Sequence, residues 1–399
     1  MEARRAVAHE STDTVEKVEF FRHSVGVEEK AAVAAVLDSL FLTTGAEVRD
    51  FETELAAYLG VNDVIAVTSC TAAEHLVLVA LGIGPGDEVI TTSMTFLASA
   101  SAILHAGATP VFVDCDATTG NIDPDRIIAA ITPKTKAIVG VHLYGAMFDV
   151  VRVRAIADEH GLALIEDSAH CLEGTRDGFR PGQVGDAALF SFYATKAITS
   201  GEGGAIAVNS PELADKLRTL RLHGMSKGAA DRYHGPYAHW DMVELGYKAN
   251  MSNIQGAMLR PQLRRADRQR DRRELISQRY DASIAGIGDL SVPAVPDGAV
   301  SARHLYTIWT EEEVRDEWLA YLGDQGIGCA VNFRAIHQLS WLRDNVQLRF
   351  ALPNAERIGA RTISIPLYDQ LTDAEVQRVC DVLIGVPSRR VPRPSLLAL

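Results

Sequence analysis

Short apolar runs alternate with longer amphipathic stretches along the first half of the chain. The apolar runs are rich in β-branched residues and predict five strands, at Val64–Val67, Glu88–Thr91, Pro110–Val113, Ala137–Val141 and Ala163–Ile165. The amphipathic stretches predict four intervening helices, at Ala72–Leu81, Phe96–Ala106, Pro124–Ile131 and Val150–His160. This alternation predicts a largely parallel α/β sheet with helices on both faces. In such sheets, ligands bind beyond the carboxyl ends of the strands.

The pattern changes near Asn253, where a long helical stretch begins. It runs to about Ile284, with a predicted break near Pro261, because proline removes a helical hydrogen bond. Strands predicted near Leu305–Trp309 and Thr362–Ser364 indicate a smaller C-terminal α/β domain. The predicted division is a polar, poorly ordered N-terminus at 1–17, a large domain at 18–255, the long helix and small domain at 256–386, and a disordered tail at 387–399.

Composition limits the classes of partner. At 399 residues and 47% hydrophobic, the chain can bury a large core. Its net charge of −13 opposes binding to nucleic acid or to an anionic membrane, because both attract basic surfaces. The cysteines at 70, 115, 171, 329 and 380 form no CxxC pair and no zinc spacing, so we expect reduced thiols and no metal site. No apolar run approaches the ~18 residues of a membrane span and no signal peptide is recognisable, so we expect a cytoplasmic protein.

Eight arginines crowd the segment 260–279. Asp267, Asp271 and Glu274 lie among them at spacings that suit ion pairs along a helix. A solvated helix face therefore explains this segment better than a nucleic-acid site does.

One lysine lies between a predicted strand and a glycine-rich turn. Lys196 follows the apolar run Ala187–Phe190 and precedes Gly201-Glu-Gly-Gly204. Burial lowers the pKa of a lysine, and the neutral amine is the form that attacks an aldehyde to make a Schiff base. The predicted strand at 163–165 leads into Asp167, whose carboxylate would hold the proton of a pyridinium nitrogen. Together the two residues indicate a pyridoxal phosphate site, although a surface lysine and a helix-capping aspartate would explain either one alone.

Segments along most of the chain, from about Phe41 to about Leu383, resemble the sugar aminotransferases of the DegT/StrS group. Besides the Lys196 segment, they are Phe51-Glu52, Val67-Thr-Ser-Cys-Thr-Ala72, Gly82-Ile-Gly-Pro-Gly-Asp-Glu-Val-Ile90, Thr95-Phe96, Gly107-Ala-Thr-Pro-Val-Phe-Val-Asp114, Val141-His-Leu-Tyr-Gly145, Ile165-Glu-Asp-Ser-Ala-His170, Leu222-His-Gly224, Gly246-Tyr-Lys-Ala-Asn-Met251 and Ile363-Ser-Ile-Pro366. The resemblance implies a fold-type-I pyridoxal phosphate aminotransferase, in which Lys196 and Asp167 are catalytic.

The cofactor's phosphate has candidate ligands of its own. Cys70, Thr71 and Ala72 lie between a predicted strand and a predicted helix, where backbone N–H groups and the Thr71 hydroxyl can face an anion. An ordinary helix start would have the same sequence. Most relatives have a small residue at the position of Cys70. Ser191 would add a second hydroxyl.

The resemblance also implies a homodimer with shared active sites. Lys248 lies where many relatives carry asparagine, in a loop that reaches the phosphate of the neighbouring subunit. A surface lysine on a turn is the alternative.

Two further residues are candidates for contact with the cofactor ring. By resemblance, Phe96 would stack on the ring, with a core phenylalanine as the alternative. His170 lies one turn beyond Asp167, where relatives often have glutamine, and could hydrogen-bond the phenolic oxygen; core packing explains it equally well. Candidates for the substrate pocket that the sequence does not place are Tyr193, His223, His304, Tyr306 and His337.

By resemblance, the activity is amino transfer from L-glutamate to a nucleotide-linked keto sugar. The residues around Lys196, together with Lys248, resemble the C4-acting relatives, so a dTDP- or UDP-linked 4-keto-6-deoxyhexose is preferred. A C3-acting sugar aminotransferase and a cyclitol aminotransferase are alternatives. A dehydratase of the same fold is disfavoured, because those relatives carry histidine in place of the lysine. A non-catalytic regulatory DNA-binding protein is opposed by the acidic charge and by the lack of a helix-turn-helix pattern.

Overall fold

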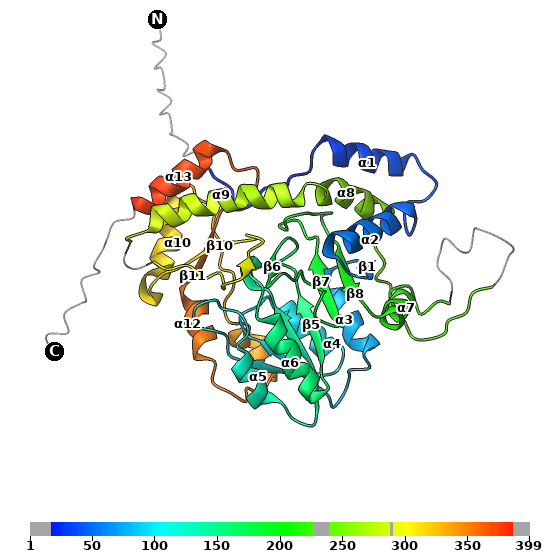
Figure 1. Cartoon of the computed structure of the whole chain (residues 1–399). Coiled ribbons are helices and arrows are strands. Elements are labelled where there is room, and N and C mark those ends of the chain that lie inside the picture. The colour runs from blue at the N-terminus through cyan, green and yellow to red at the C-terminus, as the bar shows by residue number, and fades with distance from the viewer. Residues whose placement is uncertain (1–16, 227–238, 288–289, 386–399) are drawn as a thin grey trace, which may run out of the picture.

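The computed structural model describes residues 17–226, 239–287 and 290–385 (Figure 1). The segments expected to be disordered, 1–17 and 387–399, lie outside the described residues except for Lys17.

A seven-stranded sheet forms the centre of the molecule, with the order β1-β8-β7-β5-β4-β2-β3. The strands are β1 (Asp63–Val67), β2 (Glu88–Thr92), β3 (Thr109–Val113), β4 (Thr135–Val141), β5 (Ala163–Asp167), β7 (Ala187–Ser191) and β8 (Gly204–Val208). Within this sheet, β8 alone runs antiparallel to its neighbours β1 and β7. The prediction of a largely parallel α/β sheet is confirmed.

Helices cover both faces of this sheet. They are α2 (Ala46–Leu59), α3 (Cys70–Ala80), α4 (Ala98–His105), α5 (Pro124–Ala130), α6 (Val150–His160) and α7 (Pro211–Leu220), while α1 (Val27–Leu37) packs on the helix that begins at Asn253. Side chains of α3, α4 and α7 pack on one face, while α2, α5 and α6 pack on the other. Ile65 and Val67 of β1 face the first group, whereas Val64 and Ala66 face the second, as the two-residue period of a strand requires.

The long helical stretch consists of two helices, α8 (Asn253–Leu263) and α9 (Ala266–Ile284), which run end to end along one side of the molecule (Figure 1). Pro261 lies inside the last turn of α8, and the break follows it directly at Arg264 and Arg265. The predicted break near Pro261 is therefore confirmed to within a few residues.

The remaining elements lie mostly after α9 in the chain. They are β10 (Tyr306–Trp309), β11 (Thr362–Ile365), α10 (Arg315–Asp324), α11 (Ser340–Asn345), α12 (Pro353–Arg361) and α13 (Asp373–Ile384), with a small separate pair, β6 (Thr175–Arg176) and β9 (Ala299–Val300). Among them, α13 packs on α9, whereas α11 and α12 share an apolar cluster with residues of the sheet domain. The apolar core around α9 includes Ile276, Tyr280 and Val379, and also Val18 from the beginning of the described chain. Val18 pairs with Ile327 in a parallel bridge, so both ends of the described chain meet in this core.

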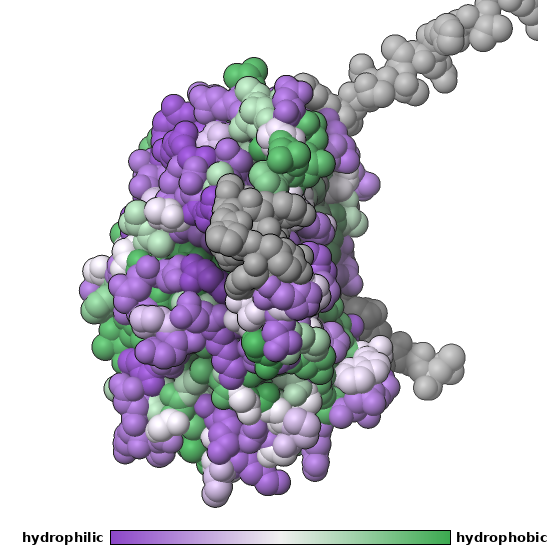
Figure 2. All heavy atoms as spheres, turned by 90° about the vertical axis from the view of Figure 1, so that its right-hand side faces the viewer, coloured by the Kyte–Doolittle hydropathy of each residue, from purple (hydrophilic) through white to green (hydrophobic). Residues whose placement is uncertain are grey.

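The surface is mixed in character. On the face that carries α7, hydrophilic side chains dominate and apolar ones form separate patches between them (Figure 2).

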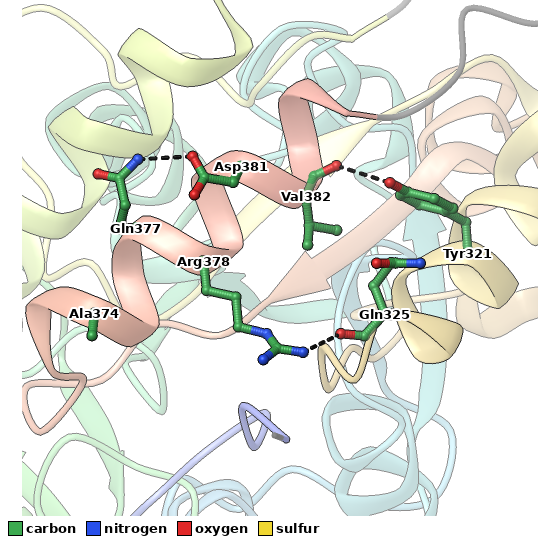
Figure 3. A pocket seen from close by; sticks show the side chains of 7 residues that line it. All are labelled: Tyr321, Gln325, Ala374, Gln377, Arg378, Asp381 and Val382. Atoms are coloured by element: carbon green, nitrogen blue, oxygen red, sulfur yellow. Dashed lines mark hydrogen bonds between the residues drawn. The ribbon is translucent and has the colours of Figure 1, made fainter. Parts of the chain in front are cut away.

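No helix among the described residues is long and apolar enough to cross a membrane. An open hollow lies between α10 and α13, where Arg378 donates to the Gln325 carbonyl oxygen at 2.9 Å (Figure 3). None of the described residues that line this hollow is a predicted site residue.

Candidate active site

The predicted site residues gather at one edge of the sheet. Because β1, β2, β4, β5 and β7 all run in one direction, the segments that follow them meet at their carboxyl ends. Cys70 follows β1, Phe96 follows β2, and Lys196 follows β7. Asp167 is the last residue of β5.

Lys196 lies in an environment that favours a neutral amine. Burial lowers the pKa of Lys196 to about 8, although the negative charge of Asp167 opposes this shift. The lysine lines a small cavity together with His170, Ser191 and His304. A lysine of this kind has a much larger nucleophilic fraction at neutral pH than a solvent-exposed one.

Asp167 is buried and held in a fixed orientation. Its Oδ1 accepts a hydrogen bond from the Ala169 N–H at 3.0 Å, and its Oδ2 accepts one from the Ser99 hydroxyl at 3.2 Å. Burial raises the pKa of Asp167, while the Ala169 N–H and the Lys196 amine act in the opposite direction. Thr95 lies 2.8 Å from Ser99, hydroxyl to hydroxyl, so the loop after β2 supports the carboxylate. Ser99 was not among the predicted site residues, and its only signal in the sequence is its place one turn beyond Phe96.

The turn between β1 and α3 forms the candidate phosphate cradle. The Ser69 hydroxyl accepts the Ala72 N–H at 3.1 Å, so that amide already caps the helix. The N–H groups of Cys70 and Thr71 are the donors left for an anion, together with the Thr71 hydroxyl. A contact of the Ala72 N–H with the phosphate stays a prediction, and this N–H would have to be shared with the Ser69 hydroxyl.

Gly204 brings a second segment against this turn. A Cβ on Gly204 would lie 2.4 Å from the Ser69 carbonyl carbon and 2.6 Å from the Cys70 nitrogen, so only glycine allows this approach. Gly204 pairs with Ser191 across β7 and β8. Gly204 therefore contacts the turn that carries Cys70 on one side and pairs with Ser191 on the other.

A row of rings lies beside Lys196. The His170 ring stacks on Phe333 at 5.7 Å between ring centroids and lies 4.4 Å from His304. Phe96 is 54% exposed, and its ring lies 5.9 Å from that of Phe333. An exposed aromatic ring at a strand end is available to stack on a flat ligand, whereas a core phenylalanine would be buried. Phe333 carried no signal in the sequence, because it comes from the C-terminal part.

Lys248 lies in a segment that packs beside the end of β1. Its side chain is exposed, and its amine donates to the Asn250 side-chain oxygen. The segment pairs with the end of β1, where the Thr68 N–H donates to the Ala249 carbonyl oxygen at 2.9 Å.

The other residues proposed for the substrate pocket lie in different parts of the molecule. His304 lines the cavity with Lys196, Tyr306 bonds Asp281 in the C-terminal core, His337 bonds Ser93, and Tyr193 and His223 are exposed.

The chemical groups at this site match those that pyridoxal phosphate requires. The donors at Cys70 and Thr71 suit a phosphate, the buried carboxylate of Asp167 suits a protonated ring nitrogen, and the Lys196 amine suits an aldehyde. The described residues contain no cluster of three potential metal ligands.

Comparison with known proteins decides the family. The model of the DegT/DnrJ/EryC1/StrS aminotransferase family matches residues 23–384. The chain belongs to this family. Its aminotransferases depend on pyridoxal phosphate and act on sugars, so the family gives the chemical class of the site described above.

Three relatives illustrate the similarity. The chain is 43% identical over 366 residues to the spore coat polysaccharide biosynthesis protein SpsC of Bacillus subtilis (strain 168), covering 90% of this chain and 94% of SpsC. It is 34% identical to S. venezuelae DesV, solved in complex with a ketimine intermediate, with a TM-score of 0.85 over 91% of this chain and 95% of DesV. The PLP-form of Spr1654 from Streptococcus pneumoniae is 30% identical, with a TM-score of 0.86 over 92% of this chain and 98% of that one.

Proposed function

We propose that this member of the family binds pyridoxal phosphate through Lys196 and transfers an amino group from L-glutamate to a nucleotide-linked 4-keto-6-deoxy sugar. The observation that carries the cofactor assignment is the partly buried Lys196, whose pKa is lowered to about 8 by desolvation of its amine, within reach of the charge of the buried Asp167 carboxylate. When bound, the cofactor supplies an electron sink for the pair released as the donor's Cα–H bond breaks.

Each residue has a defined task in this proposal. The neutral Lys196 amine would hold the cofactor through its aldehyde group and, when free, would move a proton to and from the donor's Cα. Asp167 holds the proton on the ring nitrogen, and the Ser99 hydroxyl and Ala169 N–H keep its carboxylate aimed. The Cys70 and Thr71 amides and Ser191 hold the phosphate.

The sugar is assigned from sequence similarity. Ala194 and Thr195 before the lysine, and Lys248, resemble C4-acting relatives. The matched SpsC is named for polysaccharide biosynthesis, which accords with a sugar acceptor. A C3-acting sugar aminotransferase is the second candidate, and a cyclitol aminotransferase is the third.

We also propose that the active unit is a homodimer. Met242, Val243 and Leu245 are 54%, 59% and 77% exposed in the single chain, close in sequence to Lys248. Apolar side chains of this kind favour contact with another protein surface. A second copy would bring Lys248 to the partner's phosphate site.

The test is incubation of the purified protein with ¹⁵N-glutamate and a panel of keto sugars, read by mass and by proton NMR of the product. We expect a 4-amino-4,6-dideoxy product from a nucleotide-linked 4-keto sugar. Lys196→Ala should abolish turnover, whereas Lys136→Ala, which alters an exposed lysine on β4, should not. An amine at C3 would overturn the choice of sugar alone. Turnover by Lys196→Ala near the wild-type rate would overturn the whole assignment.

A further inference from the structure

The loop after β4 contains a matched motif, His142-Leu-Tyr-Gly145, which the proposed function does not use. This loop contacts the end of β5 at three points. The His142 N–H donates to the Asp167 carbonyl oxygen at 3.0 Å, and the His142 Nε2 lies 2.9 Å from a Glu166 carboxylate oxygen. The Tyr144 N–H donates to the His170 Nδ1 at 3.3 Å. One loop therefore holds both the carboxylate strand and the histidine that follows it.

Tyr144 has an unusual backbone conformation. Its φ is +58° and its ψ is 4°, which places it in the left-handed region that residues other than Gly, Asn and Asp rarely adopt. The next residue, Gly145, has a φ of +103°, and a Cβ there would lie 3.0 Å from the Arg303 nitrogen. The phenol ring of Tyr144 is buried against Phe112 and Trp309 in one apolar cluster. Strained conformations persist where the surroundings determine them, and they occur often at functional sites.

The contact with Tyr144 determines which nitrogen of His170 carries the proton. A neutral imidazole has one donor nitrogen and one acceptor nitrogen. Because Nδ1 accepts the Tyr144 N–H, the proton of neutral His170 is on Nε2. The ring plane is fixed as well, since His170 lies between Phe333 and His304.

Burial and the nearest cation both favour the neutral form of His170: burial lowers its pKa well below the usual value, and the Lys196 amine acts in the same direction. Of the two nearby carboxylates, Glu173 is paired with Arg273 and Asp167 accepts hydrogen bonds from Ser99 and Ala169. The neighbouring ring, His304, is affected in the same way: burial lowers its pKa, and the charges of His170, Lys196 and Arg273 lower it further. The Tyr144 phenol is itself buried, which raises its pKa and keeps it uncharged. The two histidines therefore bring no positive charge to the cavity beside Lys196.

We propose that Tyr144 is a positioning residue whose main-chain N–H locks His170 in the neutral Nε2–H tautomer, so that His170 offers a hydrogen-bond donor to an anionic oxygen beside Lys196. The inference rests on the proposed function, in which that oxygen is the phenolic oxygen of the cofactor. It assigns a role to the strained turn after β4 and makes His170 a fixed donor that does not exchange protons during turnover.

The first test uses the protein without cofactor and is independent of any sugar. In a sample with ¹⁵N-labelled histidine rings, two-dimensional ¹⁵N–¹H spectra distinguish the two tautomers, and His170→Gln identifies the signal. We expect the Nε2–H pattern for His170, unchanged from about pH 6 to pH 9. An Nδ1–H pattern, or titration near the usual pKa of about 6.5, would overturn the proposal.

The second test compares two substitutions of Tyr144 that remove the same aromatic ring. Asparagine tolerates the left-handed conformation, whereas β-branched valine does not. Tyr144→Asn should keep the His170 pattern, while Tyr144→Val should give a mixture of tautomers or a titrating ring. A folded Tyr144→Val protein with the unchanged pattern would contradict the role of the turn; if that variant does not fold, the wild-type spectrum decides.

A third comparison links the tautomer to activity. In shape, glutamine places its amide near the Nε2 of histidine, and asparagine places its amide near Nδ1. His170→Gln keeps a donor toward the cavity, so it should retain kcat within about threefold, while His170→Asn should lose tenfold or more. Equal losses in the two variants would refute a donor role for Nε2–H, and the keto-sugar panel would stand unaffected.

Discussion

The charge state of Lys196 follows from two opposing effects at one atom. Burial favours the neutral amine, and the nearby carboxylate of Asp167 favours the charged one; burial is the larger effect, and the pKa falls to about 8. Asp167 is affected in the same way, because burial raises its pKa while Lys196 and two hydrogen bonds lower it. Burial and the mutual attraction of the two groups therefore act against each other at both Lys196 and Asp167.

This shift predicts how cofactor binding depends on pH. Only the neutral Lys196 amine attacks the aldehyde, so the rate of covalent capture should rise about tenfold from pH 7 to pH 9 and level off above pH 9. Stopped-flow absorbance of protein without cofactor, mixed with pyridoxal phosphate, measures this rate. A lysine with the ordinary pKa would instead give about a hundredfold rise with no plateau over that range. Such a curve would contradict the buried environment of Lys196.

Glu74 is a buried carboxyl group that the proposed reaction does not use. It is 1% exposed, and its Oε1 has no hydrogen-bond partner among the described residues. Burial raises the pKa of Glu74 well above its usual value, and the negative charge of Asp167 adds to this. The folded protein therefore binds a proton at Glu74 more tightly than the unfolded chain does, so this residue costs stability as the pH rises above the unfolded pKa.

We predict that Glu74→Gln is nearly neutral for stability at pH 5 and stabilising at pH 8. The gain should grow by about 1.4 kcal/mol for each pH unit between the unfolded and the folded pKa. Denaturant unfolding of the cofactor-free protein at both values measures it. Glu159→Gln, at an exposed position on α6, should show no such dependence. A Glu74→Gln effect that is equal at both pH values would contradict a protonated Glu74.

At the scale of elements, the sequence predicted the position of a helix or strand best where the pattern within that element was sufficient. The strands β1 to β5 and the helices α3 to α6 match their predicted ranges within about two residues, because their apolar periods are local. Lys196 and Asp167 could be found because strand ends in a parallel sheet meet at one edge. The sequence could not predict the roles of Ser99 and Phe333 or the backbone conformation of Tyr144. Each of these depends on which distant segment of the chain packs against the residue.

Gly204 shows how one residue of β8 shapes the neighbouring turn. An added Cβ would overlap the main chain of Ser69 and Cys70, which cannot yield as a flexible side chain would. Gly204→Ala should therefore displace the β1–α3 turn, weaken pyridoxal phosphate binding at least tenfold and cost about 1–3 kcal/mol of stability. Fluorescence titration and thermal unfolding measure the two effects.

The control for this change is Gly323→Ala in α10. A Cβ on Gly323 meets nothing within 4 Å, and alanine favours a helix over glycine. It should leave cofactor affinity unchanged and should not destabilise the protein. If both alanine variants bind the cofactor equally well, the close approach of Gly204 does not shape the phosphate cradle.

At the scale of the whole molecule, carboxylates of this acidic protein neutralise arginines of α8 and α9. Arg260 bonds Glu54 at 2.7 Å, and Arg273 bonds Glu173 at 2.7 Å with both side chains almost fully buried. The predicted pairing along the helix is confirmed for Arg270 and Glu274, which lie 3.2 Å apart. The prediction of a solvated face is wrong for Arg273, whose side chain is 3% exposed and bonds a glutamate from the sheet domain. The pairs of Arg260 and Arg273 join α8 and α9 to the sheet domain.

The proposed dimer makes a quantitative prediction for mixed subunits. Lys196→Ala and Lys248→Ala should each be inactive alone. After subunit exchange, each heterodimer would have one site with both lysines, so an equal mixture should recover about a quarter of wild-type activity. Activity of the exchanged mixture and its mass distribution are measured together. Complete exchange without recovery, with each single variant inactive, would place Lys248 in its own subunit's site.

The meeting of Val18 with Ile327 has a consequence for how the protein is made. The Val18 N–H and carbonyl oxygen bond Gly326 and Gly328, so the earliest part of the described chain completes a core that is synthesised some three hundred residues later. On the ribosome, the sheet domain can assemble while this segment has no partner. The C-terminal core can close only after the segment around Ile327 has been synthesised, and a fragment that lacks either segment would expose the apolar surface that the other normally covers.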